Sequence, residues 1–286
     1  MNDFKCRYAP SLGDLEDTPL NVWGTYPYGK MELNSNEDKP CVWFGLYGLP
    51  DFYSIWRHKG PKYILWAGSD IIHFQNGYWL EDGGGIKLDP TPLAEWINKN
   101  CISYVENVAE HQALLEWGIE SQIVPSFMDD VSKYEITYKH SNRPNVYIST
   151  GRDREEEYGF GVIERIADKC DVDFWLYGSD KWESKHPNVF NMGRIPKEIM
   201  NVQIQGMQCG LRLNEFDGFS EITAKSVLWG QYPITVIPTP EIDCAKDTDE
   251  LIKLLNDLKH KQSPNINGRN YYKQKLNDYP WNNRKA

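Results

Sequence analysis

The residues of this chain best suited to binding a ligand are Asp217-Gly218-Phe219-Ser220, between an apolar run and a stretch of helical spacing that ends at Gly230. The order Asp-Gly predicts a tight turn, the glycine leaves no Cβ where a ligand approaches, and Ser220 is placed to cap the helix. A helix start presents free N–H groups and the positive end of its dipole, which suit a phosphate or a sugar hydroxyl. An ordinary strand-to-helix connection has the same pattern, so both interpretations stay open.

Two carboxylates, Asp51 and Asp70, lie at the ends of the apolar runs 41–48 and 62–70. Each run predicts a buried parallel strand, and ligands bind at the carboxyl ends of such strands. Both aspartates are therefore expected at active-site positions. Either could instead form a turn or cap a helix, because aspartate is typical of both places.

A third candidate is Arg152, which follows a glycine at the end of the predicted strand 145–152. The planar guanidinium group can bind two phosphate oxygens at once, which favours arginine where a diphosphate is held. The acidic residues that follow it allow a second interpretation, a surface arginine paired with its neighbours.

Apolar runs and helix-like stretches alternate along the chain, which predicts parallel sheets covered by helices. In the second half, strands are expected at 145–152, 171–180, 188–195, 232–238 and from Cys209, with helices at 160–170, 196–206, 220–230 and 247–260. In the first half, a helix at 107–118 lies between strands at 101–106 and 121–125. The segment 73–92, with three consecutive glycines, is expected to be a loop.

The 286 residues are enough for two domains, each with its own core. The polar, proline-flanked segment 125–144 is the predicted linker. We therefore expect one domain over 1–130, a second over 145–260, and a tail over 261–286 that packs back across both.

Composition and motifs exclude several classes of function. A net charge of −10 and a pI near 5.2 argue against nucleic acid as a partner. The six scattered cysteines indicate reduced thiols, and the lack of a leader peptide or long apolar run predicts a cytoplasmic protein without a membrane span. No metal-binding motif and no G-x-S-x-G element is present, so neither a metal centre nor a serine hydrolase is expected.

The order of four short elements is informative. Gly-Arg, a Gly-Ser turn, Asn-Val-x-x-x-Gly and Asp-Gly-Phe-Ser each follow a predicted strand, in that order along the chain. This order resembles the GT-B glycosyltransferases of the glycogen-synthase-like superfamily over about 41–260. The resemblance implies two Rossmann-like α/β domains with a deep interdomain cleft, an N-terminal acceptor-side domain over 1–130 and a nucleotide-sugar-binding domain over 145–260. It also implies a UDP- or GDP-sugar as donor substrate with no other cofactor.

The resemblance also implies site residues. Donor-binding roles fall on Arg152, Arg154, Gly193, Arg194, Ile195, Asp217, Gly218, Phe219, Ser220, Glu221 and Lys225. Two positions depart from the family's pattern. The lysine expected after Gly-Arg is replaced by Glu157 or Tyr158, which leaves Arg154 as the substitute cation, and the second carboxylate of the loop is replaced by Lys225.

The implied chemistry is transfer of a hexosyl-like group without a metal, by positioning and by neutralising the leaving diphosphate. The superfamily is largely retaining, which requires no general base. An inverting enzyme would need one, with Asp51, Asp70 and His73 as candidates. The acceptor, a carbohydrate, a lipid-linked group or a protein, stays open. A catalytically idle nucleotide-sugar-binding subunit and a nucleotide-sugar epimerase are the alternatives.

Overall fold

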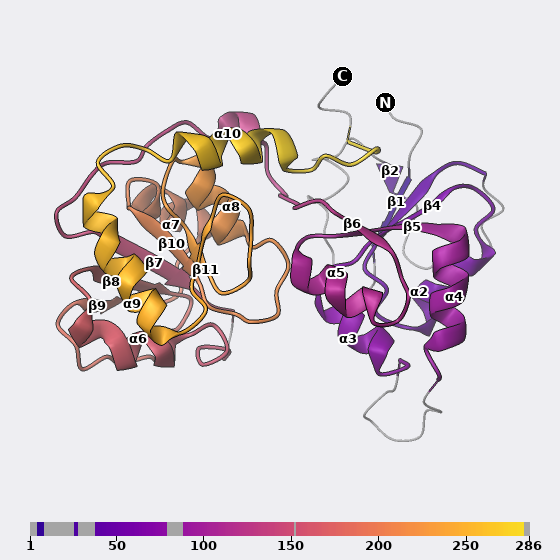
Figure 1. Cartoon of the computed structure of the whole chain (residues 1–286), viewed down its shortest axis with the longest axis horizontal. Helices are drawn as coiled ribbons and strands as arrows, with labels where there is room; N and C mark the ends of the chain where they lie inside the picture. The colour runs from indigo at the N-terminus through magenta and orange to yellow at the C-terminus, as the bar shows by residue number, and fades with distance from the viewer. Residues whose placement is uncertain (1–4, 9–25, 28–37, 79–87, 152, 283–286) are drawn as a thin grey trace. The chain divides into compact units, whose positions relative to one another are not determined.

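The computed structural model describes residues 5–8, 26–27, 38–78, 88–151 and 153–282. The chain forms two compact units (Figure 1). The first unit consists of Met1–Asp129, Phe216–Gly218 and Leu276–Ala286, and the second of Asp130–Glu215 and Phe219–Lys275. The predicted α/β class is confirmed, since each unit is built on a parallel sheet. The cleft expected between two domains stays a prediction.

The sheet of the first unit has the strand order β2-β1-β3-β4-β5-β6. Its strands are β1 Lys5–Tyr8, β2 Tyr26–Pro27, β3 Cys41–Phe44, β4 Lys62–Leu65, β5 Cys101–Val105 and β6 Ser121–Ile123. Its helices are α2 Leu49–Arg57, α3 Ser69–Gln75, α4 Thr91–Asn100 and α5 Val108–Leu115. All paired strands are parallel, which places their carboxyl ends at one edge of the sheet.

Alternate residues of these strands pack on opposite faces of the sheet, as the pleat requires. On one face, Trp43, Ile64 and Val105 join a core that also contains residues of all four helices. On the other face, a second core gathers Cys6, Val42, Leu65, Tyr104, Tyr279 and Trp281. The C-terminal segment therefore supplies the aromatic side chains that cover this second face.

The sheet of the second unit has the order β12-β11-β10-β7-β8-β9, again with parallel pairs. Its strands are β7 Asn145–Ser149, β8 Asp173–Tyr177, β9 Val189–Asn191, β10 Cys209–Arg212, β11 Ile234–Thr235 and β12 Asp243–Cys244. The helices are α6 Phe160–Ile166, α7 Lys197–Ile204, α8 Glu221–Leu228, α9 Thr248–Asp257 and α10 Ile266–Lys275, with the short 3₁₀ helices η2 Val131–Lys133, η3 Ala167–Lys169 and η4 Leu258–His260.

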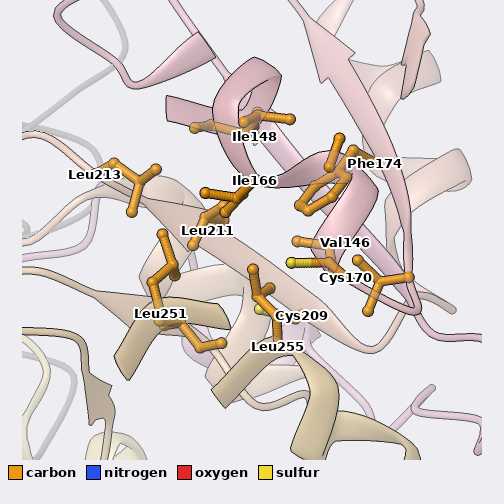
Figure 2. Packing of buried hydrophobic residues seen from close by; sticks show 14 of the residues in the cluster. Val146, Ile148, Ile166, Cys170, Phe174, Cys209, Leu211, Leu213, Leu251 and Leu255 are labelled. Atoms are coloured by element: carbon orange, nitrogen blue, oxygen red, sulfur yellow. The ribbon is translucent and has the colours of Figure 1, made fainter. Parts of the chain in front are cut away.

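Helices lie on both faces of this second sheet, as the alternation predicts. One face packs on α6 and α9, and Figure 2 shows Leu251 and Leu255 of α9 close to Cys209 and Leu211 of β10. On the other face the hydroxyl of Tyr177 donates to the Gln203 side chain of α7, at 3.0 Å. Helix α8 packs there too, where Ser226 Oγ accepts a hydrogen bond from Gly210 N at 3.0 Å.

One expectation for the polar segments is wrong in part. The segment 73–92 is not all loop, because α3 continues to Gln75 and α4 begins at Thr91, while its three glycines lie outside the described residues. The tail contains α10, and its packing across both domains stays a prediction. Tyr134 and Tyr138 of the predicted linker 125–144 are buried within the second unit, and the role of this segment as a linker stays a prediction.

All six cysteines are free thiols. Among the residues described, no helix has the length and apolar character needed to cross a bilayer.

Candidate functional site

Three loops meet at the carboxyl edge of the second unit's sheet. Thr150 N donates to Tyr177 O at 3.0 Å, and Gly178 N donates to Gly193 O at 2.9 Å, so the loops after β7, β8 and β9 are joined by backbone hydrogen bonds. Gly178 has φ of +96°, and a Cβ there would lie 2.2 Å from Thr150 O. Only glycine fits this position.

The loop after β9 carries the residues predicted to hold the nucleotide base. Gly193 has φ of +68°. Arg194 is exposed, its backbone N–H donates to Asp180 Oδ1 and its Nη2 donates to Gly178 O, both at 2.8 Å. Ile195 is half-buried. The guanidinium group thus fixes the neighbouring loop, and contact of these residues with a base stays a prediction.

The predicted diphosphate-binding arginines lie after β7. Arg152 falls outside the described residues. Arg154 forms an ion pair with Glu157, in which Nε and Oε2 are 2.6 Å apart. This hydrogen bond holds the pKa of Glu157 below its ordinary value. The charge of Arg154, which was expected to replace the family's lysine, is therefore shared with a carboxylate in the same turn.

Arg212, at the end of β10, is a cation that the sequence analysis did not single out. Its guanidinium carbon lies 4.1 Å from the centre of the Tyr158 ring, and that of Arg154 lies 5.2 Å from the same ring. Such cation–π contacts orient a guanidinium group. The charge of Arg212 also acts on Glu157, whose pKa it helps to lower after the larger effect of Arg154. Arg212 could have been found in the sequence from its place at the end of a predicted strand, just before the Asp217 loop.

Helix α8 begins as predicted, with Ser220 as its N-cap: Ser220 Oγ accepts a hydrogen bond from Thr223 N at 3.2 Å. Phe219 is buried and stacks on Tyr272 of α10, with ring centroids 5.0 Å apart. The start of α8 is thus fixed by a cap and by an aromatic contact. In the first unit, Asp217 and Gly218 are half-buried, and Asp217 O accepts a hydrogen bond from Asn107 Nδ2 at 2.6 Å.

Lys225 is almost fully buried, with 3% of its surface exposed. Its Nζ lies 3.3 Å from Oε2 of Glu221, which precedes it by one helical turn, and 3.1 Å from Asn201 Oδ1. Glu221 also pairs with the exposed Lys197, at 2.8 Å. Burial alone would raise the pKa of Glu221, but the two lysines outweigh it and hold the pKa below its ordinary value. A contact of Lys225 with a nucleotide stays a prediction.

The two predicted carboxylates of the first unit organise the loops in which they lie. Asp51 Oδ2 accepts hydrogen bonds from Tyr47 N and Gly48 N, both at 3.1 Å, at the start of α2. Asp70 is fully buried, and its two oxygens accept from Leu46 N and Ala67 N, both at 2.9 Å. Burial raises the pKa of Asp70 to about 6. Their role as general base stays a prediction.

His73, the third base candidate, is exposed on α3 and makes an edge contact with the ring of Tyr47, at 5.9 Å between centroids. Glu110 of α5 has a fully buried carboxyl group, which the sequence analysis did not single out. Burial, with the nearby charge of Glu106, raises its pKa well above the ordinary value. Within the described part of the chain, no group of three or more His, Cys, Asp or Glu side chains is arranged to hold a metal ion.

Comparison with known proteins identifies the fold. No protein-family model matches the chain, and no curated protein matches it in sequence. Among solved structures it is similar to the apo form of the lipopolysaccharide outer core galactosyltransferase WaaB, at a TM-score of 0.56 and 12% identity, over 96% of this chain and 95% of that one. The chain has the GT-B fold.

Other structures with the GT-B fold agree. Sucrose-phosphate synthase from Thermosynechococcus elongatus matches 82% of this chain and 69% of its own, at a TM-score of 0.54 and 13% identity. HepE from Anabaena, solved with UDP and glucose, matches 82% of this chain and 73% of its own, at a TM-score of 0.53 and 10% identity. TarM has a TM-score of 0.53 and 13% identity over 80% of this chain, which spans 50% of the length of TarM. The resemblance of the sequence to the GT-B fold is thereby confirmed.

Proposed function

We propose that this protein is a glycosyltransferase that moves a hexosyl-like group from a nucleotide sugar to an acceptor. The observation that carries the proposal is the GT-B fold, which WaaB shares over nearly the whole of both chains. WaaB is a galactosyltransferase, and HepE was solved with UDP and glucose. Both findings favour a nucleotide-sugar donor for this chain.

The donor is proposed to lie at the carboxyl edge of the second unit's sheet. Hydrogen bonds join the loops at Thr150, Gly178 and Gly193, and α8 begins with a capped N-terminus. Parallel α/β sheets bind nucleotides at this edge, and a helix N-terminus favours a negatively charged group. Arg152 and Arg212 are proposed to neutralise the diphosphate as it leaves.

The acceptor is proposed to meet the first unit's edge near Asp51, Asp70 and His73. The acceptor class, a carbohydrate, a lipid-linked group or a protein, stays open. We further propose a metal-independent, retaining reaction in the cytoplasm. Release of nucleotide that persists in excess EDTA, with product of unchanged anomeric configuration, is the expected result.

The test is release of nucleotide from a panel of UDP- and GDP-sugars, first with water and then with candidate acceptors. Parent protein is expected to release nucleotide from one member, and Arg212→Met to release it much more slowly. Arg143→Met is the matched control, because Arg143 pairs with Asp171 and Asp173 on the surface of the same unit. If no nucleotide sugar binds or reacts, the proposal is wrong.

One observation favours a catalytically idle nucleotide-sugar-binding subunit instead. Lys225 stands where the family has a carboxylate, and it is already paired with Glu221 and Asn201. An idle subunit would bind a nucleotide sugar and release nothing with any acceptor. An epimerase would change the sugar without an acceptor, so analysis of the recovered sugar separates the three.

A further inference from the structure

Asn107 uses both ends of its side chain, and only one end serves its own helix. Its Oδ1 accepts a hydrogen bond from Glu110 N at 3.0 Å, which makes Asn107 the N-cap of α5. Its Nδ2 donates to the backbone oxygen of Asp217 at 2.6 Å, although the two residues are 110 positions apart. Asn107 is buried, with 4% of its surface exposed.

The second hydrogen bond is not needed for helix capping. Serine, threonine and aspartate cap helices about as well as asparagine, because the cap requires only a side-chain acceptor. A serine or threonine hydroxyl must use one oxygen for both accepting and donating, and an ionised aspartate has no donor, whereas asparagine has an acceptor atom and a separate donor atom. The NH₂ group of Asn107 is therefore the part of the side chain that acts on the Asp217 segment.

The backbone around Asp217 is closely packed in the first unit, to which Phe216–Gly218 belongs. A Cβ at Gly218 would lie 1.8 Å from Glu106 Oε2, and a Cβ at Gly68 would lie 3.7 Å from Gly218 N. A side chain at 218 would therefore displace the Glu106 carboxylate, and Gly68 lies in ordinary van der Waals range of Gly218 N. Glu106 is itself held, because Ser126 Oγ donates to its Oε1.

The turn that carries Asn107 is held from below by Glu110. Glu110 Oε2 accepts a hydrogen bond from Glu106 N at 2.7 Å. Its Oε1 is buried and has no hydrogen-bond partner among the described residues. Burial and the charges of Glu106, Asp70 and Asp217 raise the pKa of Glu110 well above its ordinary value. The hydrogen bonds from Glu106 N to Glu110 Oε2 and from Glu110 N to Asn107 Oδ1 hold the turn that carries the Asn107 amide.

We propose that Asn107 is a positioning residue for the Asp217-Gly218 turn: its amide holds the carbonyl of Asp217 and so fixes the backbone of this turn within the first unit. The proposal rests on the proposed function, with this turn holding the donor sugar. Asn107 acts through the turn and does not itself contact the donor.

Two variants separate the tie from the cap. Asn107→Ser and Asn107→Asp both keep an acceptor for Glu110 N. Neither replaces the tie to Asp217 O at pH 8, because the serine hydroxyl is a single polar atom on a shorter side chain and the ionised aspartate has no donor. Asp247→Asn is the matched control. Asp247 caps α9 by accepting from Glu250 N at 2.8 Å, and this variant replaces a capping aspartate by asparagine, the reverse of Asn107→Asp. All three are expected to unfold within a few degrees of the parent.

The first measurement is hydrogen–deuterium exchange of peptides that cover 214–223, without any ligand. Both Asn107 variants are expected to exchange faster than parent and than Asp247→Asn at pH 8. At lower pH, near pH 5, the carboxyl group introduced by Asn107→Asp, which lies close to Glu106 and Asp217, is expected to be protonated and to donate to Asp217 O again. After correction for intrinsic exchange, Asn107→Asp then approaches parent and Asn107→Ser does not. Equal exchange in parent and both variants at pH 8 would overturn the tie.

The second measurement compares affinities for UDP with UDP-glucose, and for GDP with GDP-mannose. For the pair that parent binds, both variants are expected to lose about fivefold in affinity for the nucleotide sugar, the effect of one hydrogen bond, and less than twofold for the nucleoside diphosphate. An equal loss for both ligands, or none, refutes positioning of the sugar. If parent binds no nucleotide sugar, the proposed function fails, and the exchange data still decide whether Asn107 holds the loop.

Discussion

Two lysines hold the same carboxylate in α8, and they differ in burial. Lys225 and Lys197 both pair with Glu221, but the Lys225 side chain is 4% exposed and the Lys197 side chain 56%. Replacing each by methionine keeps most of the side-chain volume and removes one charge. The difference in unfolding free energy between the two variants therefore measures how much burial strengthens an ion pair with Glu221.

The expected magnitudes follow from the environment of each ammonium group. Loss of Lys197 removes an exposed pair, which is worth about 0–1 kcal/mol and is screened by salt. Loss of a buried partner costs about 3–5 kcal/mol when a buried charge is left alone. Glu221 is 39% exposed and keeps Lys197, so we expect about 1–2 kcal/mol for Lys225→Met, including the hydrogen bond lost at Asn201.

The assay is urea unfolding of parent, Lys197→Met, Lys225→Met and Lys225→Glu at low and high salt. Lys225→Glu should lose most, about 3 kcal/mol, because it places two carboxylates together at a buried position. The pKa of Glu221 is below its ordinary value, so its pairs stabilise the protein above that ordinary value and are lost as the pH falls. Equal losses of unfolding free energy in Lys197→Met and Lys225→Met, or no loss in Lys225→Met, would refute the role assigned to burial.

The same variants test the donor site. If Lys225 contacts the nucleotide, Lys225→Glu lowers the affinity for a nucleoside diphosphate at least tenfold, about 1.4 kcal/mol, and less at high salt. A folded Lys225→Glu variant with parental affinity removes Lys225 from the donor site.

Three further predictions concern single side chains. Because burial raises the pKa of Asp70 from 3.8 to about 6, the free energy of unfolding should fall as the pH rises through that window, and Asp70→Asn should remove up to about 3 kcal/mol of this dependence in urea unfolding. The same variant is expected to lower turnover and leave donor affinity nearly intact; a collapse of donor affinity would contradict its acceptor-side assignment. Arg152→Ala should weaken nucleoside-diphosphate binding by about 1.5–3 kcal/mol and nucleoside binding far less, in titration calorimetry; equal affinities for the diphosphate remove Arg152 from the site. Trp281→Ala should destabilise the first unit by about 3–5 kcal/mol, because Trp281 is fully buried; a thermal unfolding profile like that of parent would show that its packing contributes little.

Most inner strands could be predicted from the sequence because they are short apolar runs ended by glycine or a polar turn, whereas the inner strand β1, with Lys5 and Arg7, was missed. The run that begins at Asn145 is one such strand, and β7 ends at Ser149. Helix α8 was equally readable, since Ser220 caps it and Gly230 follows its end. Local signals agree with the fold at these places.

Helix α10, which the sequence analysis did not expect, lacks such local signals. Helix α10 contains Gly268 and no apolar period, and it buries little beyond that glycine and Tyr272. Its place is fixed by tertiary contacts: Arg269 donates to Leu228 O at 2.8 Å and to Tyr134 O at 2.7 Å. Tertiary contacts override weak helix propensity here.

Part of the candidate site could be predicted from local sequence signals, and part could not. Glycines and charged residues at strand ends pointed to the second unit's edge. The roles of Asn107 and Glu110 could not be read from the sequence, because each depends on partners that only folding brings near. A buried carboxyl group with an unpartnered oxygen looks like any other glutamate on a helix until its surroundings are known.

The aromatic cover of the first sheet affects the order in which the two units can mature on the ribosome. Tyr279 and Trp281 stack with ring centroids 4.6 Å apart and pack on Tyr104, yet they are synthesised after the whole of the second unit. Nascent domains usually fold in the order of synthesis. Here every residue of the second unit is synthesised before these two rings, so this core of the first unit can form only after the second unit has been made. A chain that ended before Leu276 would lack both rings.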